Sequence, residues 1–247
     1  MDSYDYLVLP EVEKWQRQML HKPSFLNRLS RKAQGKINSW IPEKVHAGVT
    51  YAIKQMVTAV LFGARYTTSA PLRDQDLKAR ELLVEEKIRL YRNTAAVEGG
   101  ITGAGGILMG LADFPLLMAI KIKLLFEIAS VYGFDTRNYK ERIYILYIFE
   151  LAFSSHEHRR NVYLKMTDWD KKATELPDDL NQFEWRSFQQ EYRDYIDLAK
   201  MAQLVPVIGA PVGVIANYRL IRKLGLTAKN AYRMRLLNSS NSGTIKK

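Results

Sequence analysis

Apolar side chains recur along much of the chain at intervals of three and four residues, the spacing that places them on one face of an α-helix. One stripe runs from Leu77 to Ala95, a second from Val45 to Leu61, and a third from Trp185 to Ala199. Turn signals, among them Gly133 and Gly225, fall between such runs. Period-2 alternation bounded by hairpin turns is absent. The pattern therefore predicts an all-α fold, built as a single multi-helix domain.

The segment from Ile143 to Phe149 is ambiguous, because its Ile and Tyr residues are also typical of a buried strand. Its apolar character continues to Phe153, which is longer than a usual buried strand. We therefore expect a buried helix here.

Two segments combine apolar residues with a high density of glycine, Thr94–Ile120 and Val205–Asn217. Several of their glycines are four residues apart, so each pair lies on one helix face and permits close approach of a second helix. A glycine inside a helix costs about 1 kcal/mol relative to alanine, which predicts either tight packing or broken helices. We expect glycine-rich, close-packed central helices, with conditional insertion of these segments into a membrane as the alternative.

Charge is distributed unevenly along the chain, whose formal net charge is +11. Residues 14–73 carry 11 Lys or Arg and one acid, and residues 198–247 carry nine Lys or Arg and no acid. Residues 1–13 and 74–197 each have a net charge of −4. Such segregation predicts an anionic partner: a membrane surface, an acidic face of a transporter subunit or, ranked lower, nucleic acid. A solubilising surface that binds nothing specific is the alternative.

Several kinds of site are excluded by what the sequence lacks. No cysteine is present, which excludes a disulfide, a thiolate metal site and a cysteine nucleophile. No glycine run carries the Lys-Ser/Thr of a phosphate-binding loop. The four histidines lack the partners of a zinc or di-iron site, so we expect no metal and no other cofactor. Asp2 and Asp5 stand where a signal peptide needs basic residues, which predicts a cytoplasmic protein.

Glu98 and Asp113 are the acids embedded in the first glycine-rich segment. As a carboxylate pair with raised pKa values, they would serve as acid and base in a hydrolase. The preferred interpretation is structural: Glu98 ends a polar helix, and Asp113 caps a helix that starts near Pro115. The sequence thus favours a non-enzymatic protein and leaves a hydrolase centred on these acids as the alternative.

The strongest binding candidate is the segment Phe25–Ile41, whose apolar residues share one helical face beside basic residues. A basic amphipathic helix with Phe and Trp on its apolar side suits a membrane interface, and packing on the core is the alternative. Basic residues of the C-terminal helix form a second candidate. The expected lipid-binding or partner-binding residues are Phe25, Arg28, Leu29, Arg31, Lys32, Trp40, Arg219, Arg222, Lys223 and Arg233.

The glycine-rich segments with their flanks also resemble a known family. Glu98-Gly-Gly-Ile-Thr-Gly-Ala-Gly-Gly leads to Asp113-Phe-Pro115, and Pro206-Val-Ile-Gly209-Ala-Pro-Val-Gly213 leads to Asn217-Tyr218. In this order the segments resemble the EcsC family of bacterial proteins, over about residues 40–237. The resemblance implies a gene neighbourhood with an ABC exporter and implies no catalytic residue. The residues that carry it are Gly99, Gly103, Gly106, Gly110, Asp113, Pro115, Gly133, Pro206, Gly209, Gly213 and Asn217.

We therefore expect a non-enzymatic accessory protein, peripheral at the cytoplasmic face of the membrane and linked to an ABC exporter. The expected domains are a basic amphipathic segment (1–40), an EcsC-like helical domain (41–237) and a flexible basic tail (238–247). Its partner would be an anionic membrane surface or a subunit of the transporter.

Overall fold

The computed structural model describes residues 3–21, 51, 53–60, 70–104, 106–154, 158–182 and 209–244. Within these ranges the chain forms helices and the turns between them, and no extended strand occurs. The predicted all-α fold is confirmed, and so is a helix over the ambiguous residues 143–149.

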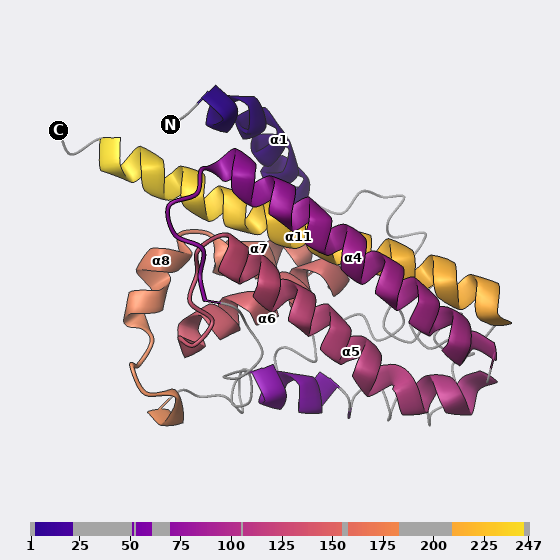
Figure 1. Ribbon diagram of the computed structural model, residues 1–247. Helices are drawn as coiled ribbons and strands as arrows, with labels where there is room; N and C mark the ends of the chain where they lie inside the picture. The colour runs from indigo at the N-terminus through magenta and orange to yellow at the C-terminus, as the bar shows by residue number, and fades with distance from the viewer. Residues whose placement is uncertain are drawn as a thin grey trace.

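Three long helices, α4, α5 and α11, run along the length of the molecule (Figure 1). α1 lies across one end of this layer, where it contacts α11, α7 and α4, and α6 and α7 pack on the other side of α11. The elements in chain order are α1 (Ser3–Leu20), α4 (Leu77–Ala104), α5 (Gly106–Val131), α6 (Tyr139–Phe153), α7 (Arg159–Met166), α8 (Trp169–Lys172), η3 (Ala173–Glu175), η4 (Leu180–Gln182) and α11 (Gly209–Thr244). Residues 53–58 are also α-helical.

The antiparallel pairing of α11 with α4 is the most extensive contact between described helices. Gly225 of α11 faces Ile88 of α4, and farther along the pair Tyr218 of α11 lies beneath the guanidinium of Arg92 of α4. A β-carbon built on Gly225 would lie 2.5 Å from Cγ1 of Ile88, so the two helices meet where no side chain is present. Our expectation of a turn at Gly225 is therefore wrong, because this glycine serves helix packing inside α11.

The buried faces follow the predicted periodicity. Val84, Ile88, Tyr91 and Ala95 form the inward face of α4, which confirms the stripe over residues 77–95. In the second stripe, residues 53, 56 and 60 are buried, whereas its start and the whole stripe over residues 185–199 lie outside the described residues. α6 is buried over most of its surface by α5, α7 and α11, which explains why its sequence lacks an amphipathic pattern.

Gly133 ends α5 with φ of +92°, the left-handed region that glycine adopts most readily. Its amide donates to the carbonyl of Ser130 at 3.0 Å, and the amide of Phe134 donates to that of Ala129 at the same distance. These bonds satisfy carbonyls at the end of the helix, and they confirm the predicted turn.

We expected one helix to end at Glu98 and another to begin near Pro115, capped by Asp113, and both expectations are wrong. α4 continues through Glu98 to Ala104, and α5 runs from Gly106 through Asp113 and Pro115. The reason is tertiary: α4 and α5 pack against each other, and such packing outweighs the local preference of glycine and proline for a break. Gly99, Gly103, Gly106 and Gly110 thus lie in helices, but the side chains of residues 98–114 are not described and close glycine packing stays a prediction.

The second glycine-rich segment is described only from Gly209 onward. Gly209 and Gly213 form the first turns of α11, and Pro206 lies outside the described residues. At its other end α11 continues to Thr244, beyond the point at which we expect a flexible tail. Among the helices the structure describes, none combines the length and apolar character required to cross a bilayer.

Lys121 on α5 is a buried cation, with none of its surface exposed. Its ammonium donates to the carbonyl of Leu117 at 3.2 Å, one turn earlier on the same helix. Burial lowers the pKa of Lys121 to about 7, because the charged form loses its hydration without gaining a carboxylate among the described residues.

Replacing Gly225 by Ala should destabilise the protein, although alanine is the better helix former. The added β-carbon collides with Ile88, and overpacking of this kind costs about 1–3 kcal/mol. A double-mutant cycle with Ile88→Ala, measured by urea unfolding, tests this, because the smaller side chain at position 88 removes the collision. The double variant should therefore lose less free energy of unfolding than the two single variants lose in sum. Leu226→Ala, at an exposed neighbour, is the control and should change little; additive losses at positions 225 and 88 would contradict the predicted close contact.

Lys121→Met should raise the free energy of unfolding, because it removes the cost of burying an ammonium group. The pKa of Lys121 is about 7 in the folded protein, and its ordinary value is 10.5. Between pH 7 and pH 10.5 the unfolded chain therefore binds more protons than the folded chain. The contribution of Lys121 to the free energy of unfolding rises with pH across this range. The advantage of the Met variant should be largest at pH 7 and below and shrink toward pH 10. Chemical denaturation of both proteins across this range measures it, and an advantage independent of pH would refute it.

Candidate functional site

The basic side chains of α11 divide into two groups along the helix. Lys229, Arg233 and Arg235 lie toward its C-terminal end and form ion pairs with carboxylates of other helices. Arg219 and Arg222 lie toward its N-terminal end, are exposed, and have no ion pair with a described carboxylate. The α4–α11 pair therefore has a neutralised end and a basic end.

Arg233 is at the centre of the neutralised end, where it and Glu81 of α4 are both 2% exposed. Its guanidinium binds both carboxylate oxygens of Glu81, and Nη1 also donates to Glu11 of α1 at 2.8 Å. The Tyr4 hydroxyl donates to Glu81 at 2.8 Å, and Lys229 lies 3.4 Å from the same carboxylate. This cluster joins α1, α4 and α11.

The pKa values of the pair follow from this arrangement. Burial opposes ionisation of Glu81, but the hydrogen bonds and charge of Arg233 outweigh it, and the pKa of the carboxyl is lowered. Burial likewise opposes the charge on Arg233, but the bonds from Glu81 and Glu11 keep the pKa of the guanidinium above its usual value. Both groups are therefore ionised at neutral pH.

The prediction that Arg233 binds lipid or a partner is thus wrong. A side chain 2% exposed and held by two carboxylates does not offer a charge to an external surface. The sequence could not reveal this, because Glu81 lies 152 residues away and only the folded chain brings the two together.

Arg235 is neutralised in the same way on the opposite side of α11. Its guanidinium donates to both oxygens of Glu141, at 2.7 and 2.9 Å, and to the carboxylate of Asp170. It also lies over two aromatic rings, with its central carbon 3.9 Å from the ring centre of Phe134 and 4.5 Å from that of Tyr144. Burial opposes the charge, yet Glu141 and Asp170 raise the pKa of Arg235 above its ordinary value.

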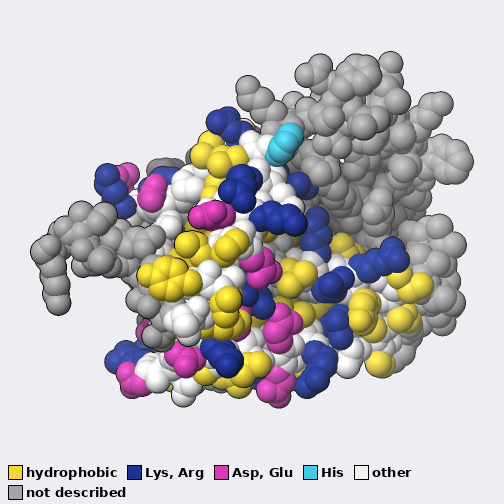
Figure 2. All heavy atoms as spheres, turned by 90° about the horizontal axis from the view of Figure 1, so that it is seen from above, with side chains coloured by type: hydrophobic (Ala, Val, Ile, Leu, Met, Phe, Trp, Pro, Cys, Tyr) yellow, Lys and Arg dark blue, Asp and Glu magenta, His cyan; other side chains and the backbone are white. Residues whose placement is uncertain are grey.

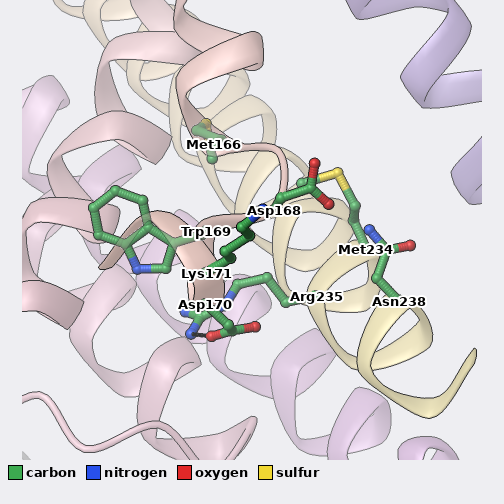
Figure 3. A pocket seen from close by; sticks show the side chains of 8 residues that line it. All are labelled: Met166, Asp168, Trp169, Asp170, Lys171, Met234, Arg235 and Asn238. Atoms are coloured by element: carbon green, nitrogen blue, oxygen red, sulfur yellow. Dashed lines mark hydrogen bonds and ion pairs between the residues drawn. The ribbon is translucent and has the colours of Figure 1, made fainter. Parts of the chain in front are cut away.

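Beside this ion pair lies a pocket of about 560 Å³ (Figure 3). Figure 3 shows the dashed contact between Asp170 and Arg235, with the Trp169 ring turned away from it. Because the only cation buried in the wall is already paired with carboxylates, the pocket presents no free positive charge from Arg235. The lining residues are Met166, Asp168, Trp169, Asp170, Lys171, Met234, Arg235 and Asn238.

Within the described part of the chain, no group of three or more His, Cys, Asp or Glu side chains is placed to hold a metal ion. Glu98 and Asp113 lie on successive helices, α4 and α5, but their side chains are outside those described, so the hydrolase alternative stays untested.

The basic end of the helix pair consists of residues 87–97 of α4 and 214–226 of α11. These residues include six Lys or Arg and no acid. Arg89, Arg219, Arg222 and Lys223 are exposed, and we call these four side chains the basic face. Lys87 pairs with Glu127 at 3.0 Å, and Arg92 is partly exposed with its guanidinium 4.4 Å from the ring centre of Tyr218.

Apolar side chains are exposed among these charges. Val97 is 66% exposed, Leu90 57% and Ile215 52%. Viewed from above, blue and yellow side chains lie side by side toward the right of the described surface, whereas the magenta acidic side chains lie over its middle and left, among further blue ones (Figure 2). The surface therefore combines positive charge with exposed hydrocarbon.

Three of the expected binding residues are exposed, and six others are not described; that they bind a partner stays a prediction. Arg219, Arg222 and Lys223 belong to the basic face, whereas Phe25, Arg28, Leu29, Arg31, Lys32 and Trp40 lie outside the described residues. Sequence reasoning missed Arg89. The available signal was a run of bases without an acid from 87 to 92, between the acids at positions 81–86 and Glu98. A charge count over the wider segment 74–197 conceals this run.

Asn217 is a family-motif residue whose surroundings are partly visible. It is fully buried on α11, and neither its amide nitrogen nor its amide oxygen has a hydrogen-bond partner among the described residues. An unsatisfied buried amide costs free energy, so its presence is not explained by stability alone.

Arg233→Met should lower the free energy of unfolding by about 3–5 kcal/mol, because it leaves the buried carboxylate of Glu81 without its main counter-charge. The double variant Glu81→Leu/Arg233→Met should recover much of the loss, since neither charge is then buried alone. Denaturant titration at neutral pH measures both. A double variant less stable than Arg233→Met would show that the pair contributes net stability beyond mutual neutralisation, contrary to this prediction.

Comparison with known proteins places these features in a family. The EcsC protein family matches residues 7–237. The chain is 41% identical to Protein EcsC of Bacillus subtilis (strain 168), over 95% of this chain and 97% of that protein. It is 26% identical to the uncharacterized protein YdbA of the same organism, over 92% of this chain and 90% of that one. No solved structure matches the chain significantly. The chain therefore belongs to the EcsC protein family.

Proposed function

We propose that this protein is a non-enzymatic accessory protein that docks reversibly on an anionic membrane surface through its basic face. The observation that carries the proposal is the charge separation along α4 and α11. Six Lys or Arg and no acid occupy residues 87–97 and 214–226; four of these side chains are exposed, and Lys87 pairs with Glu127. At the other end, Lys229, Arg233 and Arg235 of α11 pair with carboxylates from four helices.

The magnitude of the attraction is sufficient for reversible binding. Each Lys or Arg near an anionic bilayer contributes about 1 kcal/mol, so Arg89, Arg219 and Arg222 of the basic face contribute roughly 3 kcal/mol at low salt. Such binding weakens as ionic strength rises, because the Debye length shrinks to about 10 Å at 0.1 M salt. Docking of this kind therefore responds to lipid charge and to salt.

The orientation supports the same proposal. α1 and the cluster around Arg233 lie at the end of the α4–α11 pair opposite the basic face. Docking through the basic face turns the ion-pair cluster around Arg233 away from an anionic surface.

The family resemblance adds a setting for this docking. It implies a gene neighbourhood with an ABC exporter, so we place the membrane in question at the cytoplasmic side of such a transporter. An acidic face of a transporter subunit is the second anionic partner, and co-purification with the exporter distinguishes it from lipid.

The triple variant Arg89→Gln/Arg219→Gln/Arg222→Gln should bind anionic vesicles roughly a hundredfold more weakly at low salt, since each removed charge contributes about 1 kcal/mol. The matched control Lys14→Gln/Arg160→Gln/Lys171→Gln removes the same charge from exposed positions on α1, α7 and α8. Vesicle flotation with and without anionic lipid, at low and high salt, measures the difference. Equal loss in both triples would show that net charge alone governs binding, and recovery of the wild type only in the soluble fraction would refute lipid docking.

A further inference from the structure

We infer that the basic face binds membranes by inserting Leu90, Val97 and Ile215 between the lipid headgroups, so that docking selects bilayers with loosely packed headgroups. This inference rests on the proposed docking and adds to it the physical property of the membrane that is recognised. The partner is a lipid surface that offers both negative charge and gaps over its hydrocarbon.

The placement of the apolar side chains on α4 carries the first part of the argument. Leu90 and Val97 are seven residues apart, which puts them almost in line on one helix face. They are 57% and 66% exposed, while the opposite face of the same helix is buried through Ile88 and Ala95. The exposed hydrocarbon is therefore not part of the core.

The same arrangement occurs on α11. Ile215, Arg219 and Arg222 follow one another at helical spacing on the exposed side, and Ile215 is 52% exposed. Tyr218, beside them, is 37% exposed beneath Arg92. An amphipathic ring with a cation above it is typical of the boundary between headgroups and acyl chains.

A surface that combines exposed cations with exposed apolar side chains is better suited to binding a bilayer than to binding a second copy of this chain. Two copies joined through this surface would bring the four cations of one basic face against those of the other, since a two-fold interface contacts itself. An anionic bilayer instead complements the cations, and its acyl region accepts the apolar side chains between them.

Charge and hydrocarbon respond differently to conditions. Salt screens the attraction of the basic face for phosphate groups, but it does not weaken the transfer of apolar side chains out of water. The inserted side chains need space between headgroups, which unsaturated acyl chains and high curvature supply. Binding should thus retain a salt-resistant component only on loosely packed membranes.

The test compares vesicles of equal anionic-lipid content and size that differ only in acyl-chain unsaturation. Wild-type protein should bind the loosely packed vesicles at least tenfold more tightly at high salt, which corresponds to about 1.4 kcal/mol. Leu90→Ser/Val97→Ser/Ile215→Ser should lose this preference while still binding both vesicle types at low salt. The control Tyr6→Ser/Leu7→Ser/Leu82→Ser replaces side chains that are 63%, 75% and 67% exposed at the other end of the molecule, and it should behave as wild type.

The outcomes separate this inference from the docking on which it rests. If the wild type binds loosely and tightly packed vesicles equally and salt releases it completely, the proposed insertion of apolar side chains is wrong. Docking driven by charge is then still supported. Absence of binding to any anionic vesicle at low salt overturns both. Because all substituted positions are exposed, unchanged helicity and unfolding midpoint of each variant show that a loss of binding is not a loss of fold.

Discussion

The contact between Glu81 and Arg233 is the constraint on which the arrangement of the helices depends. Two ions 2% exposed must meet each other in a fixed geometry, because either one alone in the interior is strongly unfavourable. Since Glu81 belongs to α4 and Arg233 to α11, satisfying both ions sets the register of the two helices. Glu11 and Tyr4 extend the same constraint to α1.

The register of α4 and α11 also determines which basic side chains remain exposed to an external partner. Every acid of α4 from Glu81 to Glu86 lies at one end of the pair, where Lys229 and Arg233 of α11 meet Glu81 and Glu85. Farther along, Gly225 lets α11 approach Ile88, and beyond this crossing no acid follows on either helix within the described side chains. The interior ion pairs and the exposed basic face are thus two results of one alignment.

Much of the fold could be predicted from the sequence, because burial leaves a local periodic signal. The inward face of α4, the helix at residues 143–149 and the turn at Gly133 all follow from spacing and residue type. Gly225 could not be assigned correctly, since a glycine that ends a helix and one that admits a neighbouring helix are alike in sequence. The continuous helices through Glu98 and Pro115 were missed for a related reason: packing between helices decided against a local break.

The candidate site was less accessible to sequence reasoning than the fold. Counting charges along the chain correctly marks the C-terminal helix as basic, but it cannot distinguish Arg222, which faces solvent, from Arg233, which is buried against Glu81. That distinction depends on contacts between residues far apart in the chain. Arg89 was hidden for a different reason, since the acids of the wider segment 74–197 outweigh its charge when the charges are summed.

The distance in sequence between Glu81 and its partner has a consequence for biosynthesis. α4 leaves the ribosome well before α11, so the nascent chain holds a carboxylate and an apolar seam that wait for a helix not yet translated. Compact native structure in this half of the molecule is therefore completed after synthesis of α11 rather than during elongation. Until then the incomplete chain exposes this apolar seam, the kind of surface at which aggregation begins.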